Sequence, residues 1–320
     1  MCRTRLALFS DAMSALLSIP WFRLDPWAVP LPFGATFHVQ PFGVLAAVAM
    51  LVCSRLAAVR ARQLQLSQRE LAAFLARVTL VGIVSAYLLN IVLYLPEAWA
   101  EIAAQPWLLV TRWYGLSSYG GFMGGALAAW HFAYVRRAPL LKLGDAWCFA
   151  FPFAWFFARL GCFCVHDHPG VPSDFALAVA DWNHTGIARH DLGLYEVLWS
   201  VPVAAWFWHS RARDRAAGYY LGLLCASYGP VRFALDFLRE DAAHGGDLRV
   251  ADLTPAQYLS LALTGFGVAF LLQLRAQRSK RPRSTAKHIL GLVICLSPAC
   301  AARAEDKAQL PERGEISAAQ

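Results

Sequence analysis

Long apolar stretches recur along this chain, and each is long enough to cross the hydrocarbon core of a bilayer as a helix of about 20 residues. They leave no room for an independent soluble core. The sequence therefore predicts an all-α, polytopic membrane protein with about seven transmembrane helices. The expected spans are residues 37–58, 71–95, 116–135, 141–165, 192–210, 217–237 and 253–274.

The composition indicates that lipid is the main solvent. Of the 320 residues, 58% are hydrophobic and 16% are charged, against roughly 45–50% and 25% in soluble domains. The cysteines lie mostly within or beside apolar stretches, where a free thiol behaves as a small hydrophobe, so no disulfide framework is expected. The formal charge of +8 comes from short basic clusters between the spans, and we therefore expect no nucleic-acid binding.

The connections between the spans differ in charge. Those that follow the first, third, fifth and seventh spans carry 16 Lys and Arg residues, and the alternate connections carry 4. Because positive loops stay in the cytoplasm, the N-terminus is predicted outside and the end of the seventh span inside. The sparsely charged outer connections also contain most of the Gly, His, Asp and Trp residues, so any polar chemistry is expected to face outward.

The two ends of the chain differ from the spans. Residues 6–33 contain four prolines and several charges, so they are expected to lie along the membrane surface, with Trp21 and Trp27 at headgroup depth. Residues 1–275 are predicted to form one membrane domain. Residues 276–320 are expected to be a basic linker, a short apolar segment that either spans or lies on the membrane, and a polar tail.

A glycine-rich segment opens the third expected span, from Tyr114 to Gly125. Gly120 and Gly121 would allow another helix or a lipid headgroup to come close to the backbone. Packing between helices is one interpretation of these glycines, and contact with a lipid is the other. Tyr119 is an interfacial anchor or a hydrogen-bond donor.

Arg159 stands near the outer end of the fourth span. It lies about 27 Å along a helix from the cytoplasmic entry, at headgroup depth. A guanidinium binds phosphate oxygens in pairs, so Arg159 is a candidate ligand for a lipid phosphate, with an interfacial snorkelling role as the alternative.

Cysteine and histidine alternate shortly after this arginine, at Cys162, Cys164, His166 and His168. Both residue types bind zinc, but the spacing does not fit the two separated pairs of a structural zinc site. We therefore expect neither a metal nor another cofactor. His166 or His168 is instead a candidate general base, because histidine ionises near neutral pH.

Charged residues within spans are functional candidates, because burying them in lipid is costly. Arg232 and Asp236 are four residues apart in the sixth span, so they can pair on one helix face. Tyr195 and Glu196 occupy the first turn of the fifth span. Arg77, in the middle of the second span, either pairs with Glu196 or Asp236 or shows that this span is misplaced.

These clusters, in this order, resemble the prolipoprotein diacylglyceryl transferases of bacterial inner membranes, over roughly residues 20 to 275. The family's His-Gly-Gly, Arg-x-Gly-Asn-Phe, Gln-Leu-Tyr-Glu and Arg-Phe-x-x-Glu-x-x-Arg motifs each have a counterpart here. In the same order, the counterparts are Tyr119-Gly120-Gly121; Arg159, Gly161 and Phe163, with a glycine that follows the arginine at Gly170; Gly193 to Glu196; and Arg232, Phe233, Asp236 and Arg239.

The resemblance implies a multi-pass protein of the bacterial inner membrane that moves a diacylglyceryl group from phosphatidylglycerol to the lipobox cysteine of a prolipoprotein. The product would be a thioether, and glycerol phosphate would leave. Lipid and signal peptide would both enter from the bilayer. The implied catalytic residues are Arg159, Arg232, His166, His168 and Tyr119. The implied substrate-binding residues are Gly120, Gly121, Gly161, Cys162, Gly170, Tyr195, Glu196, Asp236 and Arg239.

Four positions depart from the family pattern. Tyr119 replaces a histidine, Cys162 an asparagine and Asp236 a glutamate, and Phe42 stands where a tyrosine is expected on the first span. The phosphate-binding arginines remain, whereas the proton-transfer groups have changed. One hypothesis is that His166 or His168 has become the base. The alternatives are a transferase with another acceptor, a non-catalytic lipid-binding or transport relative, and a metal-dependent membrane hydrolase.

Overall fold

The structure is a computed structural model that describes residues 19–34, 36–112, 114–213, 215–240, 249 and 251–280. The chain divides into two units, residues 1–272 and 273–320. All the packing described below lies within the first unit. Of the second unit, only the last turns of one helix, up to Lys280, are described.

A helix occupies each of the seven predicted ranges. They are α2 (Pro41–Gln63), α3 (Gln68–Tyr94), α6 (Ser118–Arg136), α7 (Leu140–Val165), α8 (Leu192–Ser210), α9 (Tyr219–Leu235) and α10 (Pro255–Lys280). Within the described residues, five of these helices are long and apolar enough to cross a membrane, namely α2, α3, α7, α9 and α10. Helices α6 and α8, with 19 residues each, are not among these five.

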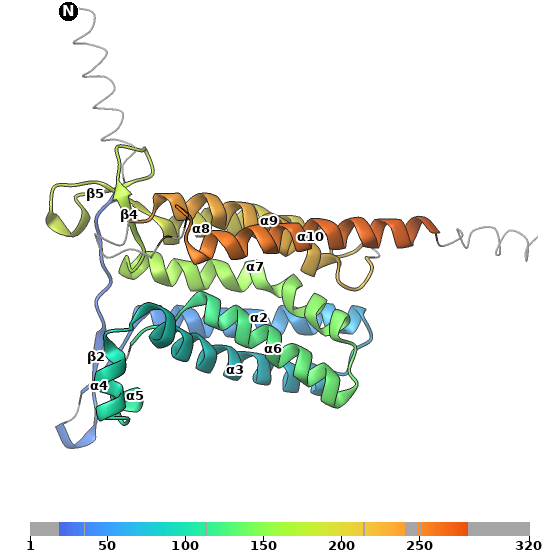
Figure 1. Cartoon of the computed structure of the whole chain (residues 1–320), viewed down its shortest axis with the longest axis horizontal. Helices are drawn as coiled ribbons and strands as arrows, with labels where there is room; N and C mark the ends of the chain where they lie inside the picture. Colours follow the sequence, from blue (N-terminus) through green and yellow to red (C-terminus); the bar gives the residue numbers. More distant parts are fainter. Residues whose placement is uncertain are drawn as a thin grey trace, which may run out of the picture. The chain divides into compact units, whose positions relative to one another are not determined.

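Short elements connect the helices at one of their ends (Figure 1). The helical ones are α4 (Ala98–Ala104), α5 (Leu108–Thr111) and the 3-10 turns η1 (Pro32–Gly34), η2 (Trp182–His184) and η3 (Asp236–Leu238). The strands are β1 (Ile19–Pro20), β2 (Trp27–Pro30), β3 (Thr36–Val39), β4 (Pro169–Pro172), β5 (Val179–Ala180) and β6 (Arg189–Asp191). Strands β2 and β3 form a hairpin, and the other four make a sheet in the order β1-β5-β6-β4.

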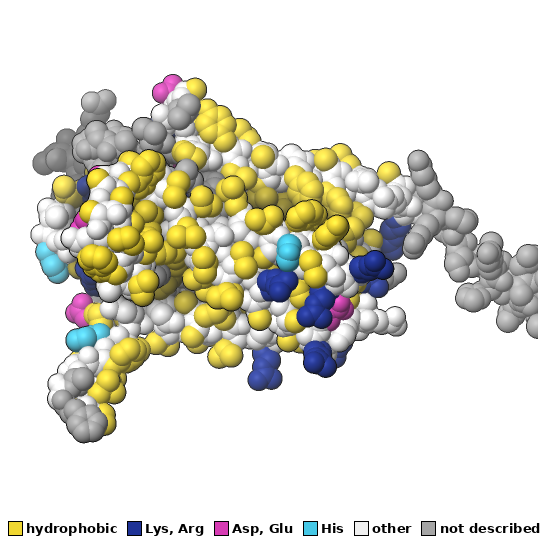
Figure 2. Space-filling model, turned by 60° about the horizontal axis from the view of Figure 1, so that its bottom comes forward, with side chains coloured by type: hydrophobic (Ala, Val, Ile, Leu, Met, Phe, Trp, Pro, Cys, Tyr) yellow, Lys and Arg dark blue, Asp and Glu magenta, His cyan; other side chains and the backbone are white. Residues whose placement is uncertain are grey.

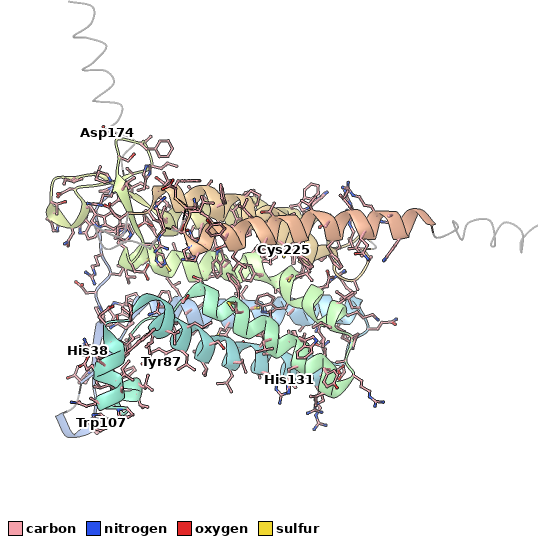
Figure 3. All side chains as sticks on the ribbon, in the orientation of Figure 1. His38, Tyr87, Trp107, His131, Asp174 and Cys225 are labelled. Atoms are coloured by element: carbon pink, nitrogen blue, oxygen red, sulfur yellow. The ribbon has the colours of Figure 1, made fainter. Side chains whose placement is uncertain are left out.

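This polar end corresponds to the connections predicted to lie outside. Trp107 and Asp174 are found there, and His131 lies toward the other end of the helices (Figure 3). The described part of the segment predicted to lie on the membrane surface, residues 19–33, enters β1, β2 and η1. Its first residues, and those from 281 onward, lie outside the described part of the chain.

Helix α7 lies against α2, α8 and α9, and α3 lies against α6 (Figure 1). The buried core runs between these helices and contains many aromatic and small side chains, such as Phe74, Phe132, Phe149 and Phe207. Hydrophobic side chains also cover the outer sides of the helices, and Lys and Arg gather at the end away from the strands (Figure 2). An apolar flank with charges at its end is the surface expected of a membrane domain.

A buried ion pair lies at this basic end. Arg60 of α2 contacts Asp145 of α7, with 2.9 Å between Nη2 and Oδ2. The other carboxylate oxygen of Asp145 accepts a hydrogen bond from the backbone N–H of Tyr220, at the start of α9, at 2.8 Å. The pair therefore joins three helices.

The expected pairing of Arg77 with Glu196 or Asp236 is wrong, since those carboxylates pair with Arg159 and Arg232. Arg77 is exposed on α3, which occupies the predicted range, and its guanidinium lies 5.9 Å from the ring centre of Phe132.

Candidate active site

Arg159 is the centre of a buried polar cluster near the polar end of α7. Its Nε lies 3.0 Å from Oε2 of Glu196 on α8, and its guanidinium lies 4.4 Å from the ring centre of Trp155, one turn earlier on α7. Only 5% of Arg159 is exposed. The sequence indicated both charged residues but not that they pair with each other.

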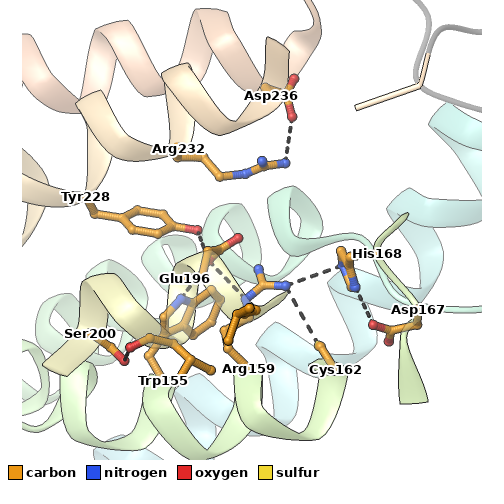
Figure 4. Close-up of polar contacts among 12 residues, drawn as sticks. Trp155, Arg159, Cys162, Asp167, His168, Glu196, Ser200, Tyr228, Arg232 and Asp236 are labelled. Carbon is orange, nitrogen blue, oxygen red and sulfur yellow. Dashed lines mark hydrogen bonds and ion pairs between the residues drawn. The ribbon is translucent and has the colours of Figure 1, made fainter. Parts of the chain in front are cut away.

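Glu196 is held by neutral donors as well. Its Oε2 accepts hydrogen bonds from Trp155 Nε1 at 2.8 Å and from the Tyr228 hydroxyl, on α9, at 3.1 Å (Figure 4). A buried carboxylate is costly unless such partners replace its hydration. Three helices therefore cooperate to hold this carboxylate, and it in turn fixes the Nε side of Arg159.

The second guanidinium reaches the cluster from α9. Arg232 Nη2 lies 2.9 Å from Oδ1 of Asp236, which confirms the pairing predicted from their spacing. Asp236 also accepts a hydrogen bond from Thr254, and Arg239 lies 3.9 Å away. The charges of Arg159 and Arg232 both act on the Glu196 carboxylate (Figure 4). Two cations held near one point in this way suit an anion such as a phosphate.

His168 stands beside Arg159, on the segment that follows α7. Its Nε2 lies 3.3 Å from Arg159 Nη1, and its Nδ1 is hydrogen-bonded to the Asp167 carboxylate. The tautomer that satisfies both contacts donates from Nδ1 and accepts at Nε2. Cys162 lies at the same place, with its Sγ 3.8 Å from Arg159 Nη1.

Asp167 was not among the residues singled out from the sequence. Its place between two histidines was the available signal, since a carboxylate often orients an imidazole. Burial would raise the pKa of Asp167, but the hydrogen bond and charge of His168 outweigh it, so this pKa lies below its ordinary value.

His166 occupies a different environment from His168. It ends α7 with a left-handed backbone, at φ 51°, and its Nδ1 lies 2.6 Å from Oδ2 of Asp191. Its ring is enclosed by aromatic rings, with centroid distances between 4.5 and 5.2 Å. Those rings belong to Trp21, Phe22, Phe163 and Trp182. The side chain is fully buried, and among the described residues its contacts are with Asp191 and these rings and not with the Arg159 cluster.

Asp191 and Tyr195 connect α8 to the strands. Asp191 caps α8 by accepting a hydrogen bond from the backbone N–H of Leu194 at 2.9 Å. The Tyr195 hydroxyl lies 2.6 Å from Nδ1 of His190 in β6, and burial lowers the pKa of that histidine. Tyr195 therefore contacts the sheet, although the next residue, Glu196, belongs to the arginine cluster.

Of the glycines named from the sequence, Gly120 and Gly170 lie at close contacts with another backbone. A Cβ on Gly120 would come 2.4 Å from the Ser85 carbonyl oxygen of α3, whereas one on Gly121 would meet nothing nearer than 3.8 Å. A Cβ on Gly161 would lie 3.1 Å from the Phe42 ring of α2. Gly170 is bridged to Arg239, and its Cβ would lie 2.6 Å from the Leu238 carbonyl oxygen. The structure describes Tyr119 as part of α6 without its side chain.

An apolar groove of about 240 Å³ lies between α2, α7 and α8. It begins within one turn of Arg159 along α7. Its lining is Val52, Phe153, Phe156, Phe157, Ser200, Val201 and Ala204.

Comparison with known proteins identifies one family. The family described as prolipoprotein diacylglyceryl transferase matches residues 29–273. Phosphatidylglycerol–prolipoprotein diacylglyceryl transferase of Nitratidesulfovibrio vulgaris is 33% identical over 178 residues, which are 55% of this chain and 67% of that protein. The protein of the same name from Solidesulfovibrio magneticus is 33% identical, covering 54% of this chain and 66% of the relative. That of Ruegeria pomeroyi is 26% identical over 295 residues, covering 82% and 99%.

Proposed function

The chain belongs to the prolipoprotein diacylglyceryl transferase family, and on this premise we propose that it transfers a diacylglyceryl group from phosphatidylglycerol to the lipobox cysteine of a prolipoprotein. The observation that carries the proposal is the pair of guanidiniums on either side of Glu196, those of buried Arg159 and partly buried Arg232. Lipid phosphate is the anion that a membrane offers at this depth.

The phosphate of the donor lipid lies between the two guanidiniums in this proposal. Arg159 is anchored at Nε by Glu196, and phosphate oxygens would bind its Nη groups by replacing the contacts of Nη1 with His168 and Cys162. Arg232 approaches from α9 and is oriented by Asp236. Holding both cations in a buried site means that they need little reorganisation when charge develops on the leaving group.

The reaction is a displacement at carbon. The sulfur of the acceptor thiolate forms a bond to the carbon of the diacylglyceryl group that carries the phosphate. The bond between that carbon and the phosphate oxygen breaks, and its electron pair leaves with glycerol phosphate. The negative charge that grows on this oxygen is next to Arg159, which therefore stabilises the transition state.

Activation of the acceptor thiol belongs to His168 and not to His166. His168 is beside Arg159 and is partly exposed, with Asp167 behind its ring. His166 is closed in by aromatic rings and committed to Asp191. The thiolate is the reactive form of the acceptor, and His168 is where it is generated.

The apolar groove between α2, α7 and α8 suits an acyl chain of the donor lipid. Its phenylalanine lining continues along α7 toward Arg159, so a chain in the groove would place its headgroup at the arginine. This arrangement supports entry of the lipid from the bilayer.

We also propose that all seven long helices cross the bacterial inner membrane, with the N-terminus outside. Helices α6 and α8 have 19 residues each, which is about 28 Å of helix and enough for the hydrocarbon core. The basic end of the helices then faces the cytoplasm, and the arginine cluster opens to the outside, where prolipoproteins emerge.

The test is to incubate the purified protein in phosphatidylglycerol membranes with a lipobox peptide and to follow glycerol phosphate release and the lipid-modified peptide. Arg159→Ala is expected to lower transfer by about 100-fold or more, as loss of a charge-stabilising group does. His168→Ala is also expected to lower transfer strongly. The matched controls Arg77→Ala, which changes an exposed arginine of α3, and His184→Ala, which changes an exposed histidine, should retain it.

Folded protein that binds phosphatidylglycerol but releases no glycerol phosphate would contradict the transferase proposal and favour a non-catalytic lipid-binding role. Release without peptide modification would point to another acceptor. Full activity of Arg159→Ala would show that this arginine is not the phosphate ligand.

A further inference from the structure

Three potential metal ligands meet beside Arg159. The ligand atoms of Cys162, Asp167 and His168 all lie within 4.8 Å of one another, in the part of the chain that the structure describes. We propose that these residues bind a divalent cation of the zinc class, and that this cation binds and activates the acceptor thiol. The inference rests on the proposed function and specifies how its thiol is activated.

The contacts within the cluster favour a common cation. The Asp167 carboxylate accepts a hydrogen bond from His168 Nδ1, and the Cys162 sulfur lies within 4.8 Å of both ligand atoms. Sulfur, nitrogen and oxygen donors therefore already lie near one point. A cation at their centre would replace the hydrogen bond between His168 and Asp167, and the cysteine ionises as it binds.

The donor set suits zinc. One thiolate, one imidazole and one carboxylate are three of its ordinary ligands, and three protein ligands leave the fourth position of a tetrahedral ion open for a substrate. Around such an ion, ligand atoms lie about 3.5 Å apart. The cluster would have to contract by about 1 Å, which is feasible because Asp167 and His168 lie beyond the end of α7 and are partly exposed.

The surrounding charges tolerate the cation. The guanidiniums of Arg159, Arg232 and Arg239 balance the carboxylates of Glu196, Asp236 and Asp167, so the group is neutral before a cation binds. A divalent cation that binds with an ionised cysteine adds one positive charge, which the phosphate of the donor lipid would then balance. With the cation on Nδ1, the His168 ring carries its proton on Nε2. It then stops accepting from Arg159 and leaves that guanidinium to the phosphate.

The alternating Cys and His residues do not all take part. Cys164 is two residues beyond Cys162 on a helix and therefore faces another direction. His166 is in its aromatic enclosure with Asp191. The four alternating Cys and His residues therefore do not form one metal site, as their spacing indicated. The site proposed here has three ligands, and one of them is Asp167.

The cation would supply the deprotonated acceptor thiol that the transfer requires. The acceptor thiol displaces a water molecule from the open position and releases its proton to solvent, since a thiol bound to zinc is deprotonated. Its sulfur then forms the bond to the glycerol carbon, and the electron pair of the broken carbon–oxygen bond leaves on glycerol phosphate beside Arg159. No oxidant or second co-substrate is required.

The first experiment measures metal directly. The full-length protein, purified and loaded with zinc, is expected to retain about one zinc per chain after desalting. Cobalt in its place should give the near-ultraviolet charge-transfer band of a thiolate ligand. Cys162→Ala, Asp167→Asn and His168→Ala should each weaken cobalt binding by about 100-fold or more, and Cys162→Ala should abolish the band.

Cys164→Ala and His184→Ala are the matched controls, and both should bind cobalt like the parent protein. Absence of bound zinc and of the cobalt band would overturn the inference. So would a band that persists in Cys162→Ala or disappears in Cys164→Ala.

A second experiment separates this inference from the proposed function. Transfer by the parent protein should fall at least tenfold after treatment with a zinc chelator and return with added zinc. Transfer that persists at full rate in the chelated protein would overturn the proposed role of the cation. His168 would then remain as a general base in an intact transferase. Protein that binds zinc but shows no transfer, either before chelation or after zinc is returned, would contradict the proposed function but not the metal site.

Discussion

His166 and His168 show what a single sequence predicts about individual residues. Both were candidates for the base because both follow Arg159 closely. Their different roles depend on the left-handed turn at His166, which directs its ring to Asp191 and the aromatic rings and leaves His168 toward the arginine. Trp21 and Asp191 are distant in sequence from His166, so its enclosure was not predictable from local pattern. The Arg232–Asp236 pair was predictable because its spacing is local.

For single residues, we predict that His166→Ala lowers the free energy of unfolding but leaves the residues that carry out the transfer in place. The substitution deletes a fully buried ring and leaves the Asp191 carboxylate buried without its partner. The expected cost is about 3 kcal/mol or more. Thermal unfolding in detergent should show a lower Tm than for the exposed control His184→Ala. Transfer per folded molecule should be retained, and its complete loss at an unchanged Tm would show that His166 acts in catalysis.

Helices were predicted well and strands were not. Hydropathy placed helices in all seven expected ranges because each apolar stretch satisfies its own backbone hydrogen bonds. The four-stranded sheet joins segments far apart in the chain, such as Ile19 with Val179, and its strands of two to four residues carry almost no periodicity. The glycines at the start of α6 gave a correct indication of helix packing at Gly120, where the backbone of α3 comes close.

The contact between α3 and α6 gives a prediction with an internal control. A Cβ at Gly120 would lie 2.4 Å from the Ser85 carbonyl oxygen and 2.7 Å from Ala86 Cα, both of which belong to the backbone. Gly120→Ala should therefore force α6 away from α3 and cost about 1–3 kcal/mol. Gly121→Ala, whose nearest contact would be 3.8 Å away, should be tolerated. Equal unfolding temperatures for the two variants would contradict this packing.

The whole molecule has two chemically different ends, and the distribution of charge along the sequence predicted them. Lys and Arg gather at one end of the helices, and the strands lie toward the other (Figures 1 and 2). Arg159 stands near the end of α7 that leads into β4, so the arginine cluster belongs to the second end. The buried Arg60–Asp145 pair at the basic end was not predicted, because its residues are 85 positions apart in the sequence. Such pairs depend on how the helices come together, which composition and hydropathy do not determine.

The orientation across the membrane is the last prediction. The connection after α7 contains Asp174 and few basic residues, whereas α6 ends with Arg136 and is followed by Arg137. Alkaline phosphatase, which is active only outside the cytoplasm, should be active when fused after Asp174 and inactive when fused after Arg137. Green fluorescent protein at the same positions should give the opposite pattern. The reverse result for both reporters would place the arginine cluster on the cytoplasmic side, where secreted lipobox cysteines do not emerge, and would contradict the proposed acceptor as well as the orientation.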